Sequence, residues 1–397
     1  MEGNRLFMSK TRIFGYRRSN GTLGIRNHIA VMPSVDCANE VAKRISNQVE
    51  NTVALPHTGG CGTYGDDIEK TFQTLAGLGA NSNVAGVLIV GLGCETIDAD
   101  LLISEILKRS PGKIVEKVIV QDEHGTSNAI RNGIILASKM ARKASMLEKS
   151  EGTMEDVILA LDCGGSDPTS GLAANPALGY VTEKIIDGGG SAILCETREI
   201  IGAEHILAEN AVTEKVANDL LEVVHEVEIK CKNWLTGTNQ RLMSAGNIRS
   251  GLTTIEEKSL GCINKVGNAK VVEVVRYAQK PGKKGLIVMD TTAHDIPSMT
   301  GMVAGGAQVI AFTTGKGSTV GYALAPVIKI TGNSETYKNL GENMDINAST
   351  IISGQETIEE VGERIFHEVI QVYNGKLTKA ESFGFSDFAI STLAGAF

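Results

Sequence analysis

Several short apolar segments of this chain run directly into loops of glycine, cysteine and carboxylate residues. Residues 87–90 lead into the loop 91–95, and residues 157–161 lead into the loop 162–167. Helical patterns separate these segments, which is typical of a parallel sheet. Ligands bind such sheets outside the carboxyl ends of the strands. The sequence therefore predicts an α/β enzyme whose reactive groups gather at strand ends.

The alternation of strands and helices predicts two or three Rossmann-like lobes with mainly parallel sheets and an active site in the cleft between them. We expect an N-terminal α/β domain over residues 14–148 and a C-terminal α/β domain over residues 152–397, with a subdivision near residues 265–280 as the alternative. The polar run 142–155 indicates a linker. The main expected strands are residues 29–32, 53–55, 84–90, 118–120, 157–161, 192–194, 286–289, 309–312 and 327–330, and the main expected helices are residues 37–48, 68–78, 98–108, 127–147, 213–234 and 358–373.

Composition argues against a nucleic-acid or membrane partner. The 397 residues include 38 basic and 46 acidic side chains, a net charge of −8, and no basic block forms the positive face that nucleic acid requires. The apolar runs are far shorter than the roughly 20 residues that cross a bilayer. No basic-then-apolar leader opens the chain, so we expect a cytoplasmic protein.

The odd number of cysteines, seven, favours free thiols or metal ligands over disulfides. Cys195 follows an apolar strand and fits either a buried or a reactive role. Three cysteines lie in Gly-rich loops, which favour reactivity or ligation: Cys61, Cys94 and Cys163. We expect three others, in helix-like or apolar surroundings, to be buried small hydrophobic residues: Cys37, Cys231 and Cys262.

The loops of the first unit carry donors suited to a metal. His57 and Cys61, four residues apart in a Gly-rich turn, could hold a divalent ion. A tight loop with an incidental cysteine is the alternative. Cys94 and Glu95 add a thiol and a carboxylate at another strand end, and Gln121 follows the next strand.

The second unit carries candidates for anion binding and proton transfer. The loop 163–171 could present backbone N–H groups to a carboxylate at a helix N-terminus. The alternative is an ordinary helix that Thr169 or Ser170 caps. The segment 196–205 contains Glu196, Glu204 and His205, which could divide general acid and base roles, or could be solvated surface residues.

Two glycine patterns resemble dinucleotide-binding motifs but do not match them. The run 315–321 has one residue too many for GxGxxG, and the run 91–93 lacks the third glycine. No GxxxxGK[ST] phosphate loop is present. The sequence therefore disfavours a nicotinamide or ATP enzyme.

Taken together and in order, these loops resemble those of the altronate/galactarate dehydratase family. The resemblance covers nearly the whole chain. It is carried by GYRRSNGTLGIRNH from Gly15, PHTGGCG from Pro56, NVAGVLIVGLGCE from Asn83, CGGSDPTSGLAANPALG from Cys163, ETREIIGAEH from Glu196, GNIRSGLTTIEEKSLG from Gly246, MDTTAHDIPSMTG from Met289 and AFTTGKGS from Ala311.

The resemblance implies a hydro-lyase that removes water from a sugar acid such as altronate or galactarate and gives a 2-keto-3-deoxy acid. It also implies iron(II), with an iron–sulfur cluster or another divalent metal such as Mn²⁺ as alternatives. In the mechanism we expect, a metal polarises the substrate while protein groups move protons in a β-elimination. Thiolates suit clusters, and the loop cysteines 61, 94 and 163 are enough for one with an open iron.

We expect three functional roles for residues in these loops. The expected catalytic residues are His57, Glu196, Glu204 and His205. The expected metal ligands are His57, Cys61, Cys94, Glu95, Cys163 and Gln121. The expected substrate-binding residues are Arg26, Asn27, Gly164, Gly165, Ser166, Asp167, Asn175, Lys258, Asp290, Thr314 and Gly315.

The same resemblance leaves alternatives open. Full-length family members carry a small N-terminal SAF-type domain before this region, so we expect a large catalytic subunit with a separate small SAF-domain partner, and a homo-oligomer is a further alternative. A related large subunit, that of (2R)-sulfolactate sulfo-lyase, shares an SDTTSG motif close to the SDPTSG from Ser166. A C–S lyase that releases sulfite from a sulfonate is therefore the alternative enzyme, and a sugar-acid-binding scaffold subunit is the non-enzyme alternative.

Overall fold

The N-terminal unit is built on a four-stranded sheet in which all neighbouring strands are parallel. The computed structural model describes residues 12–62, 65–238 and 241–391. The strand order is β4 (Thr52–Ala54), β3 (His28–Pro33), β5 (Val84–Gly91) and β6 (Ile114–Ile119). Four helices flank the sheet: α2 (Asn39–Ser46) and α5 (Thr126–Ser145) on one face, and α3 (Asp66–Ala80) and α4 (Ala99–Arg109) on the other.

The C-terminal unit is built on a larger sheet of seven parallel strands. Its strand order is β10 (Val271–Val275), β11 (Leu286–Met289), β9 (Ser191–Leu194), β8 (Ile158–Gly164), β12 (Val309–Thr314), β13 (Val327–Thr331) and β14 (Ile346–Asn347). Its α-helices are α6 (Asn175–Asp187), α7 (Glu204–Glu209), α8 (Glu214–Leu235), α9 (Ala245–Arg249), α10 (Ile255–Ile263), α11 (Asp295–Ala304), α12 (Ser334–Leu340), α13 (Ser349–Ile352), α14 (Ile358–Tyr373) and α15 (Lys379–Ser382).

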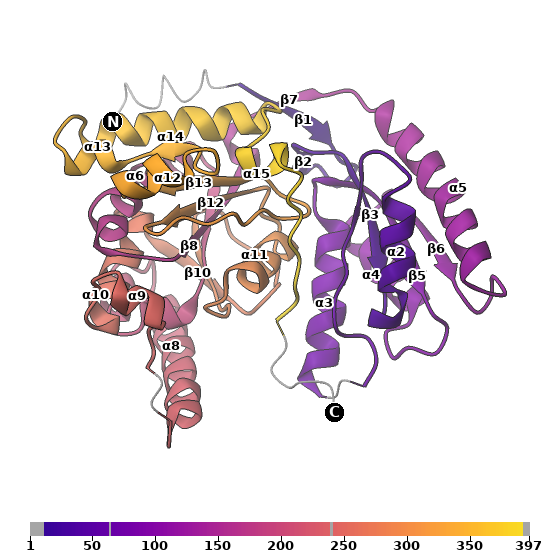
Figure 1. The fold of residues 1–397 in the computed structure, drawn as a ribbon, viewed down its shortest axis with the longest axis horizontal. Helices are drawn as coiled ribbons and strands as arrows, with labels where there is room; N and C mark the ends of the chain where they lie inside the picture. Colours follow the sequence, from indigo (N-terminus) through magenta and orange to yellow (C-terminus); the bar gives the residue numbers. More distant parts are fainter. Residues whose placement is uncertain (1–11, 63–64, 239–240, 392–397) are drawn as a thin grey trace.

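The two parallel sheets confirm the predicted α/β class. Every residue of β5 is buried, as expected for a strand that helices cover on both faces. Figure 1 shows the two units beside each other, with α8 extending from the body of the second unit. Among the described residues, no helix is long and apolar enough to cross a membrane.

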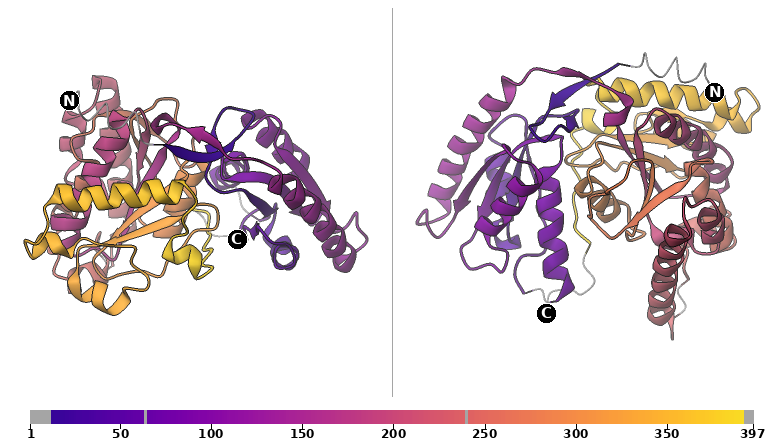
Figure 2. Two further views of the ribbon diagram at one scale, coloured as in Figure 1. Left: turned by 90° about the horizontal axis from the view of Figure 1, so that it is seen from above. Right: turned by 180° about the vertical axis from the view of Figure 1, so that it is seen from behind.

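The predicted linker at residues 142–155 is partly structured, and that expectation was wrong. Helix α5 continues to Ser145, and β7 (Ser150–Gly152) pairs antiparallel with β1 (Ile13–Arg17), which also pairs with β2 (Leu23–Gly24). The β7 strand escaped prediction because backbone pairing, rather than an apolar side-chain pattern, sets its place. The small sheet lies between the two units in all three views (Figures 1 and 2).

Helices α3 and α11 join the two units through one shared hydrophobic core. Leu75 and Leu78 of α3 belong to the same buried cluster as Met299 and Val303 of α11. Asn81, just after α3, donates its side-chain N–H groups to the carbonyls of Val303 and Ala307, at 2.7 and 3.0 Å. Satisfied buried amides of this kind fix the register of the packed helices.

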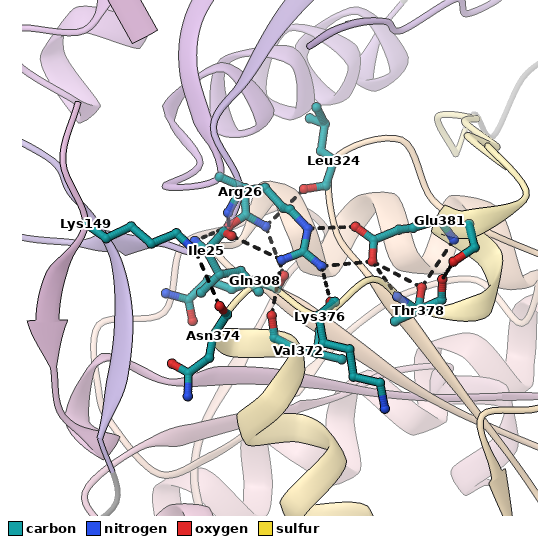
Figure 3. Close-up of polar contacts among 12 residues, drawn as sticks. Ile25, Arg26, Lys149, Gln308, Leu324, Val372, Asn374, Lys376, Thr378 and Glu381 are labelled. Carbon is teal, nitrogen blue, oxygen red and sulfur yellow. Dashed lines mark hydrogen bonds and ion pairs between the residues drawn. The ribbon is translucent and has the colours of Figure 1, made fainter. Parts of the chain in front are cut away.

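The Arg26 side chain connects the N-terminal unit to the C-terminal helices through hydrogen bonds (Figure 3). Its Nε and Nη2 donate to the Glu381 carboxylate at 2.7 and 2.9 Å. The remaining N–H groups donate to the carbonyls of Ile25, Val372 and Lys376. All five guanidinium donors are therefore satisfied within the protein, in the paired geometry that makes arginine–carboxylate contacts strong.

Asn27, the next residue, is also held inside the structure. Its side-chain oxygen accepts from Arg18 at 2.9 Å, and its amide donates to the Ala144 carbonyl at 2.7 Å. Arg26 and Asn27, both predicted to bind substrate, thus connect segments of the fold in this structure.

Replacing Arg26 with alanine should lower the free energy of unfolding by about 3–5 kcal/mol, because it leaves a largely buried carboxylate without its partner. The matched control is Arg12→Ala: the Arg12–Glu151 pair has side chains 71% and 55% exposed, against 9% and 18% for Arg26 and Glu381. The control should cost less than about 1 kcal/mol. Urea denaturation followed by circular dichroism measures both, and equal losses would contradict the structural role of Arg26.

Candidate active site

The carboxyl edge of the seven-stranded sheet brings together a buried cluster of carboxylates, thiols and lysines. Asp162 and Cys163 lie near the end of strand β8, and β9 is followed by Cys195 and Glu196. The short helix η4 (Thr197–Ile200) then supplies Glu199. This arrangement follows from the parallel topology, which places consecutive strand ends at one edge.

Helix α10 and the turn after it supply the positive charges of the cluster. Lys258 and Cys262 lie four residues apart on α10 and therefore share one face. Lys265 follows in η5 (Asn264–Val266), on the same side. Thr254 begins this helix by accepting the Glu257 backbone N–H at 3.2 Å, which fixes the register of the three side chains.

Glu199 is the centre of the cluster and is 5% exposed. Its Oε2 accepts hydrogen bonds from the thiols of Cys163 and Cys262, both at 3.1 Å. Its Oε1 forms an ion pair with the ammonium group of Lys258. The Lys265 ammonium donates to the Cys163 sulfur at 3.0 Å, and the two sulfur atoms lie 3.6 Å apart.

Two carboxyl groups of the cluster hold their protons to very different degrees. Burial raises the pKa of Glu196 well above its usual range, and the nearby charge of Glu199 adds to the effect. Burial also acts to raise the pKa of Glu199, but the charges of Lys258 and Lys265 outweigh it and lower this pKa to about 2. Burial thus favours the protonated form of Glu196, whereas the two lysines favour the ionised form of Glu199, as in sites that carry out acid–base chemistry.

The pKa of a third buried carboxyl group, that of Asp162, is also raised. Burial and the charge of Asp295 raise its pKa to about 8. Its Oδ1 accepts from the Cys195 thiol at 3.1 Å, and its Oδ2 has no hydrogen-bond partner among the described residues. Unpaired buried polar atoms cost stability, so they point to a functional place in the structure.

The backbone at Glu196 is in the left-handed region, with φ 62° and ψ 67°. This conformation costs a non-glycine residue roughly 1–3 kcal/mol and needs support from its surroundings. The Glu196 backbone N–H donates to the Thr291 hydroxyl at 2.7 Å, and the Thr197 hydroxyl donates to Asp290 at 2.8 Å. Asp290 thus holds the loop that carries the acidic pair.

A cavity of about 250 Å³ adjoins the cluster. Lys258 and Cys262 line it from one side, and Ser166, Asp167 and Asn175 line it from the loop and helix after β8. The Ser166 hydroxyl is buried and has no hydrogen-bond partner in the described part of the chain. A free hydroxyl and an ammonium group beside a small cavity can bind the carboxylate of a small acid.

The loops after β8 and β12 support this cavity through their backbones. Gly165, with φ +59°, offers its carbonyl to the N–H groups of Gly315 and Lys316 at 3.3 and 2.9 Å. The Thr314 hydroxyl accepts the Gly317 N–H at 2.9 Å. Gly164 ends β8 so close to Asp295 that a larger side chain would collide with that carboxylate.

Thr169, one of the two predicted N-caps, lies at the N-cap position of the helical segment Ser170–Ala174 but makes no side-chain capping hydrogen bond, and Asp167 supplies that bond instead. Asp167 Oδ1 accepts the Ser170 N–H at 3.1 Å and the Thr169 hydroxyl at 2.6 Å. Asn333 donates to its other oxygen at 2.8 Å. Residues Ser170–Ala174 of this segment form a π-helix.

The donors expected in the N-terminal unit lie at the carboxyl edge of the four-stranded sheet. His57 is buried, and both of its ring nitrogens form hydrogen bonds with the backbone. Nε2 lies 2.8 Å from the Pro33 carbonyl oxygen, and Nδ1 accepts the Gly59 N–H at 3.1 Å. Glu95 accepts from the Ser34 hydroxyl and from N–H groups of its own loop. These contacts outweigh burial and lower its pKa.

The other expected residues lie in three further places. Cys61 and Cys94 are exposed on the same loops, and Gln121 lies beside Gly93. Glu204 and His205 begin α7, where His205 is exposed. Asn175 bridges the Gly261 carbonyl, at 2.8 Å, and the Thr313 hydroxyl, at 2.6 Å. Thus one of the four expected catalytic residues, Glu196, lies in the buried cluster, and the other three lie elsewhere.

One of the two groups of possible metal ligands in the buried cluster is poorly suited to a divalent metal. Cys163, Glu199 and Cys262 present ligand atoms within 4.8 Å of one another, as do Asp162, Cys195 and Glu196. However, ammonium groups already occupy the first set, because Lys258 pairs with Glu199 and Lys265 with Cys163. Two positive charges repel a cation at that position.

Sequence reasoning missed several members of the cluster. Cys262 is buried as expected, but in a polar cluster, and Lys265 was not considered. Their spacing after Lys258, at i+4 and i+7, placed all three on one helical face and could have indicated them. Cys37 is exposed and Cys231 half-buried, so the expectation that both are buried was wrong.

Comparison with known proteins matches both units of the chain to one family. The family model "D-galactarate/Altronate dehydratase, C-terminal" matches residues 154–395, and "D-galactarate dehydratase/Altronate hydrolase, second domain" matches residues 15–145. The chain is 33% identical to (2R)-sulfolactate sulfo-lyase subunit beta of Chromohalobacter salexigens, over 97% of this chain and 98% of that protein.

Two longer relatives are dehydratases by name. Altronate dehydratase of Bacillus subtilis is 31% identical over 97% of this chain and 78% of its own length. Galactarate dehydratase (L-threo-forming) of Escherichia coli is 33% identical over 91% of this chain and 72% of its own length. These relatives are lyases.

The ionisation of Glu196 predicts a pH dependence of stability. The unfolded chain releases this proton near the usual pKa of 4.5, whereas the folded chain keeps it to higher pH. The stabilisation is therefore complete below about pH 4.5 and declines as the pH rises through the folded pKa. The Glu196→Gln side chain cannot ionise. Above about pH 5, the free energy of unfolding of this variant should therefore rise relative to that of the wild type, by up to about 1.4 kcal/mol per pH unit. Urea midpoints from pH 4 to 8 measure this, and parallel curves would contradict a protonated Glu196.

Proposed function

Since the chain belongs to the D-galactarate/altronate dehydratase family, we propose that it is a hydro-lyase that removes water from a sugar acid such as altronate or galactarate. The observation that supports this most is the pair of neighbouring carboxyl groups whose pKa values are shifted in opposite directions, Glu196 and Glu199. They belong to the cluster whose Lys258 lines a small cavity. Dehydration of a hydroxy acid needs one group to accept a proton and another to donate one.

Substrate binding begins at Lys258. The substrate carboxylate enters the cavity and takes the Lys258 ammonium as its partner, with the Ser166 hydroxyl as a second donor. Lys258 then no longer neutralises Glu199 fully. Because this charge is a main cause of the low pKa of Glu199, that pKa rises and Glu199 becomes a stronger base.

Elimination then proceeds by two proton transfers. Glu199 takes the proton from C2 of the acid, and Glu196 gives its proton to the hydroxyl group that leaves C3 as water. The C2–H and C3–O bonds break and a C2–C3 double bond forms, giving an enol that tautomerises to the 2-keto-3-deoxy acid. Lys258 and Lys265 stabilise the negative charge that develops on the substrate.

The alternative reaction is release of sulfite from sulfolactate. The relative that matches this chain over 98% of its own length is a sulfo-lyase subunit, and this supports the alternative. The same base serves both reactions, because each begins with loss of the C2 proton, and the leaving group alone differs. The name of that relative also supports a partner subunit, which we propose to be a small SAF-domain protein.

Activity assays decide between these reactions. The full chain, loaded with iron under anaerobic conditions, should be assayed on altronate, galactarate and sulfolactate, with and without a small SAF-domain subunit. We expect keto-acid formation without sulfite. Sulfite release from sulfolactate would establish the alternative, and no turnover of any of these acids would contradict the proposed enzyme.

Glu196→Gln should lower kcat by about 10²–10⁴-fold, because an amide cannot donate the proton that the leaving hydroxyl needs. This variant keeps the shape of the protonated side chain, so folding should be preserved. Glu209→Gln, on the exposed face of α7, is the matched control and should keep wild-type kcat. Loss of less than tenfold in Glu196→Gln would contradict its role as the acid.

A further inference from the structure

Two buried thiols of the acid–base cluster, those of Cys163 and Cys262, lie in contact with each other. Their sulfur atoms are 3.6 Å apart, and the two residues are 1% and 4% exposed. They come from segments 99 residues apart in the sequence, since Cys163 lies near the end of β8 and Cys262 in the last turn of α10. The fold therefore brings together two thiols that the sequence separates.

The backbone around this pair is closely packed. The Asn175 side chain, after β8, donates to the Gly261 carbonyl of α10 at 2.8 Å. In the other direction, the Asn264 side chain donates to the Gly171 carbonyl at 3.2 Å. A Cβ atom added to Gly171 would lie 3.0 Å from the Gly261 Cα. The residue before Cys262 is thus held against the chain that leaves β8, which keeps the two thiols together.

A disulfide bond is within reach of the two sulfur atoms. A disulfide joins its sulfur atoms at about 2.05 Å, so Cys163 and Cys262 need to bring theirs about 1.6 Å closer than the observed 3.6 Å. A change of χ1 rotamer moves a cysteine sulfur atom further than this. Side-chain rotation therefore suffices to close the distance.

The two thiols differ in their access to solutes. Cys262 lines the cavity of about 250 Å³ that adjoins the cluster, together with Lys258. Cys163 lies behind it and is 1% exposed. A small solute that enters the cavity therefore reaches Cys262 first.

Cys163 is suited to react second. Its hydrogen bond with the Cys262 thiol contributes most to the raised pKa of Cys163, and burial adds to the effect. The Lys265 ammonium, which donates to the Cys163 sulfur at 3.0 Å, acts in the opposite direction. Oxidation of Cys262 removes the first of these influences, whereas Lys265 remains. A nearby ammonium group favours the thiolate, which is the nucleophile in disulfide formation.

We propose that Cys163 and Cys262 form a disulfide bond when the protein meets hydrogen peroxide, and that this bond inactivates the acid–base site. Peroxide first transfers an oxygen atom to the Cys262 sulfur, which gives a sulfenic acid and water. The Cys163 sulfur then attacks the sulfenic sulfur. The S–S bond forms, the S–O bond breaks, and the hydroxide leaves with the Cys163 proton as a second water. The two thiols lose two electrons and two protons, and one peroxide is reduced to two waters.

The bond inactivates the site through Glu199. Both thiols donate to Glu199 Oε2 at 3.1 Å, and the sulfur atoms of a disulfide carry no hydrogen to donate. Glu199 then keeps Lys258 on Oε1 but loses the two contacts that orient Oε2. A catalytic base that is out of place reacts more slowly. This consequence, unlike the bond itself, rests on the proposed dehydration.

Peptide mapping of the full chain tests the bond. The folded protein is treated with hydrogen peroxide and denatured, its remaining thiols are alkylated, and its peptides are analysed by mass spectrometry without reductant. We expect most of the Cys163 and Cys262 peptides to be joined. Cys195, which is also 1% exposed, is the internal control and should remain a thiol, because it donates to the Leu161 carbonyl and to Asp162, at 3.2 and 3.1 Å.

Two results would overturn the proposed bond. One is Cys163 left unlinked at a peroxide dose that oxidises the exposed thiols of Cys61 and Cys94. The other is an equal yield of the Cys163–Cys262 link in protein oxidised in urea, because the fold would then not direct the pairing.

Cys262→Ser tests the effect of the bond on activity, because a serine hydroxyl can still donate to Glu199 but cannot form a disulfide. After the same peroxide treatment, the wild type should lose dehydration of the sugar acid by roughly 10- to 100-fold and regain it with a thiol reductant. Cys262→Ser should keep the activity that it has before treatment. Equal fractional losses in both proteins would contradict inactivation by this bond. A chain that dehydrates no acid before treatment would contradict the proposed function, and the peptide map would still decide the bond.

Discussion

The negative charge of Glu199 is the feature on which the candidate active site depends. It joins three segments that are far apart in sequence: the end of β8 through Cys163, the loop after β9 on which it lies, and helix α10 through Lys258 and Cys262. Burying a carboxylate costs several kcal/mol, and two lysines offset that cost here. Burial raises the pKa of Glu196 and the same charge raises it further, so the opposite shifts of the two carboxyl groups arise in one buried arrangement.

The topology explains why this chemistry is found where it is. Parallel strands bring their carboxyl ends to one edge, and each of the two sheets gathers a different set of side chains there. The larger sheet gathers carboxylates and lysines in a buried cluster, and the smaller sheet gathers exposed thiols. The α3–α11 packing and the Arg26–Glu381 pair hold the two units together.

The sequence predicted the fold class well because apolar periodicity reports which residues are buried, as in β5 and α14. It predicted Glu196, Ser166 and Lys258 as site residues because they follow strands or begin a helix in Gly-rich surroundings. It did not indicate that every N–H group of the Arg26 side chain donates a hydrogen bond within the fold, because its partner Glu381 is 355 residues away in the sequence. It also misjudged Cys37, because a thiol on a helix-like pattern looks the same whether the helix buries it or exposes it.

The central claim is that Glu196 is protonated while Glu199 is ionised at neutral pH. Infrared difference spectroscopy of the wild type against Glu196→Gln and Glu199→Gln measures both states directly, because a protonated carboxyl group and a carboxylate absorb in separate regions. We predict that at pH 7 the Glu196 variant lacks a protonated-carboxyl band and the Glu199 variant lacks a carboxylate band. A carboxylate band missing from the Glu196 variant at pH 7 would contradict the account.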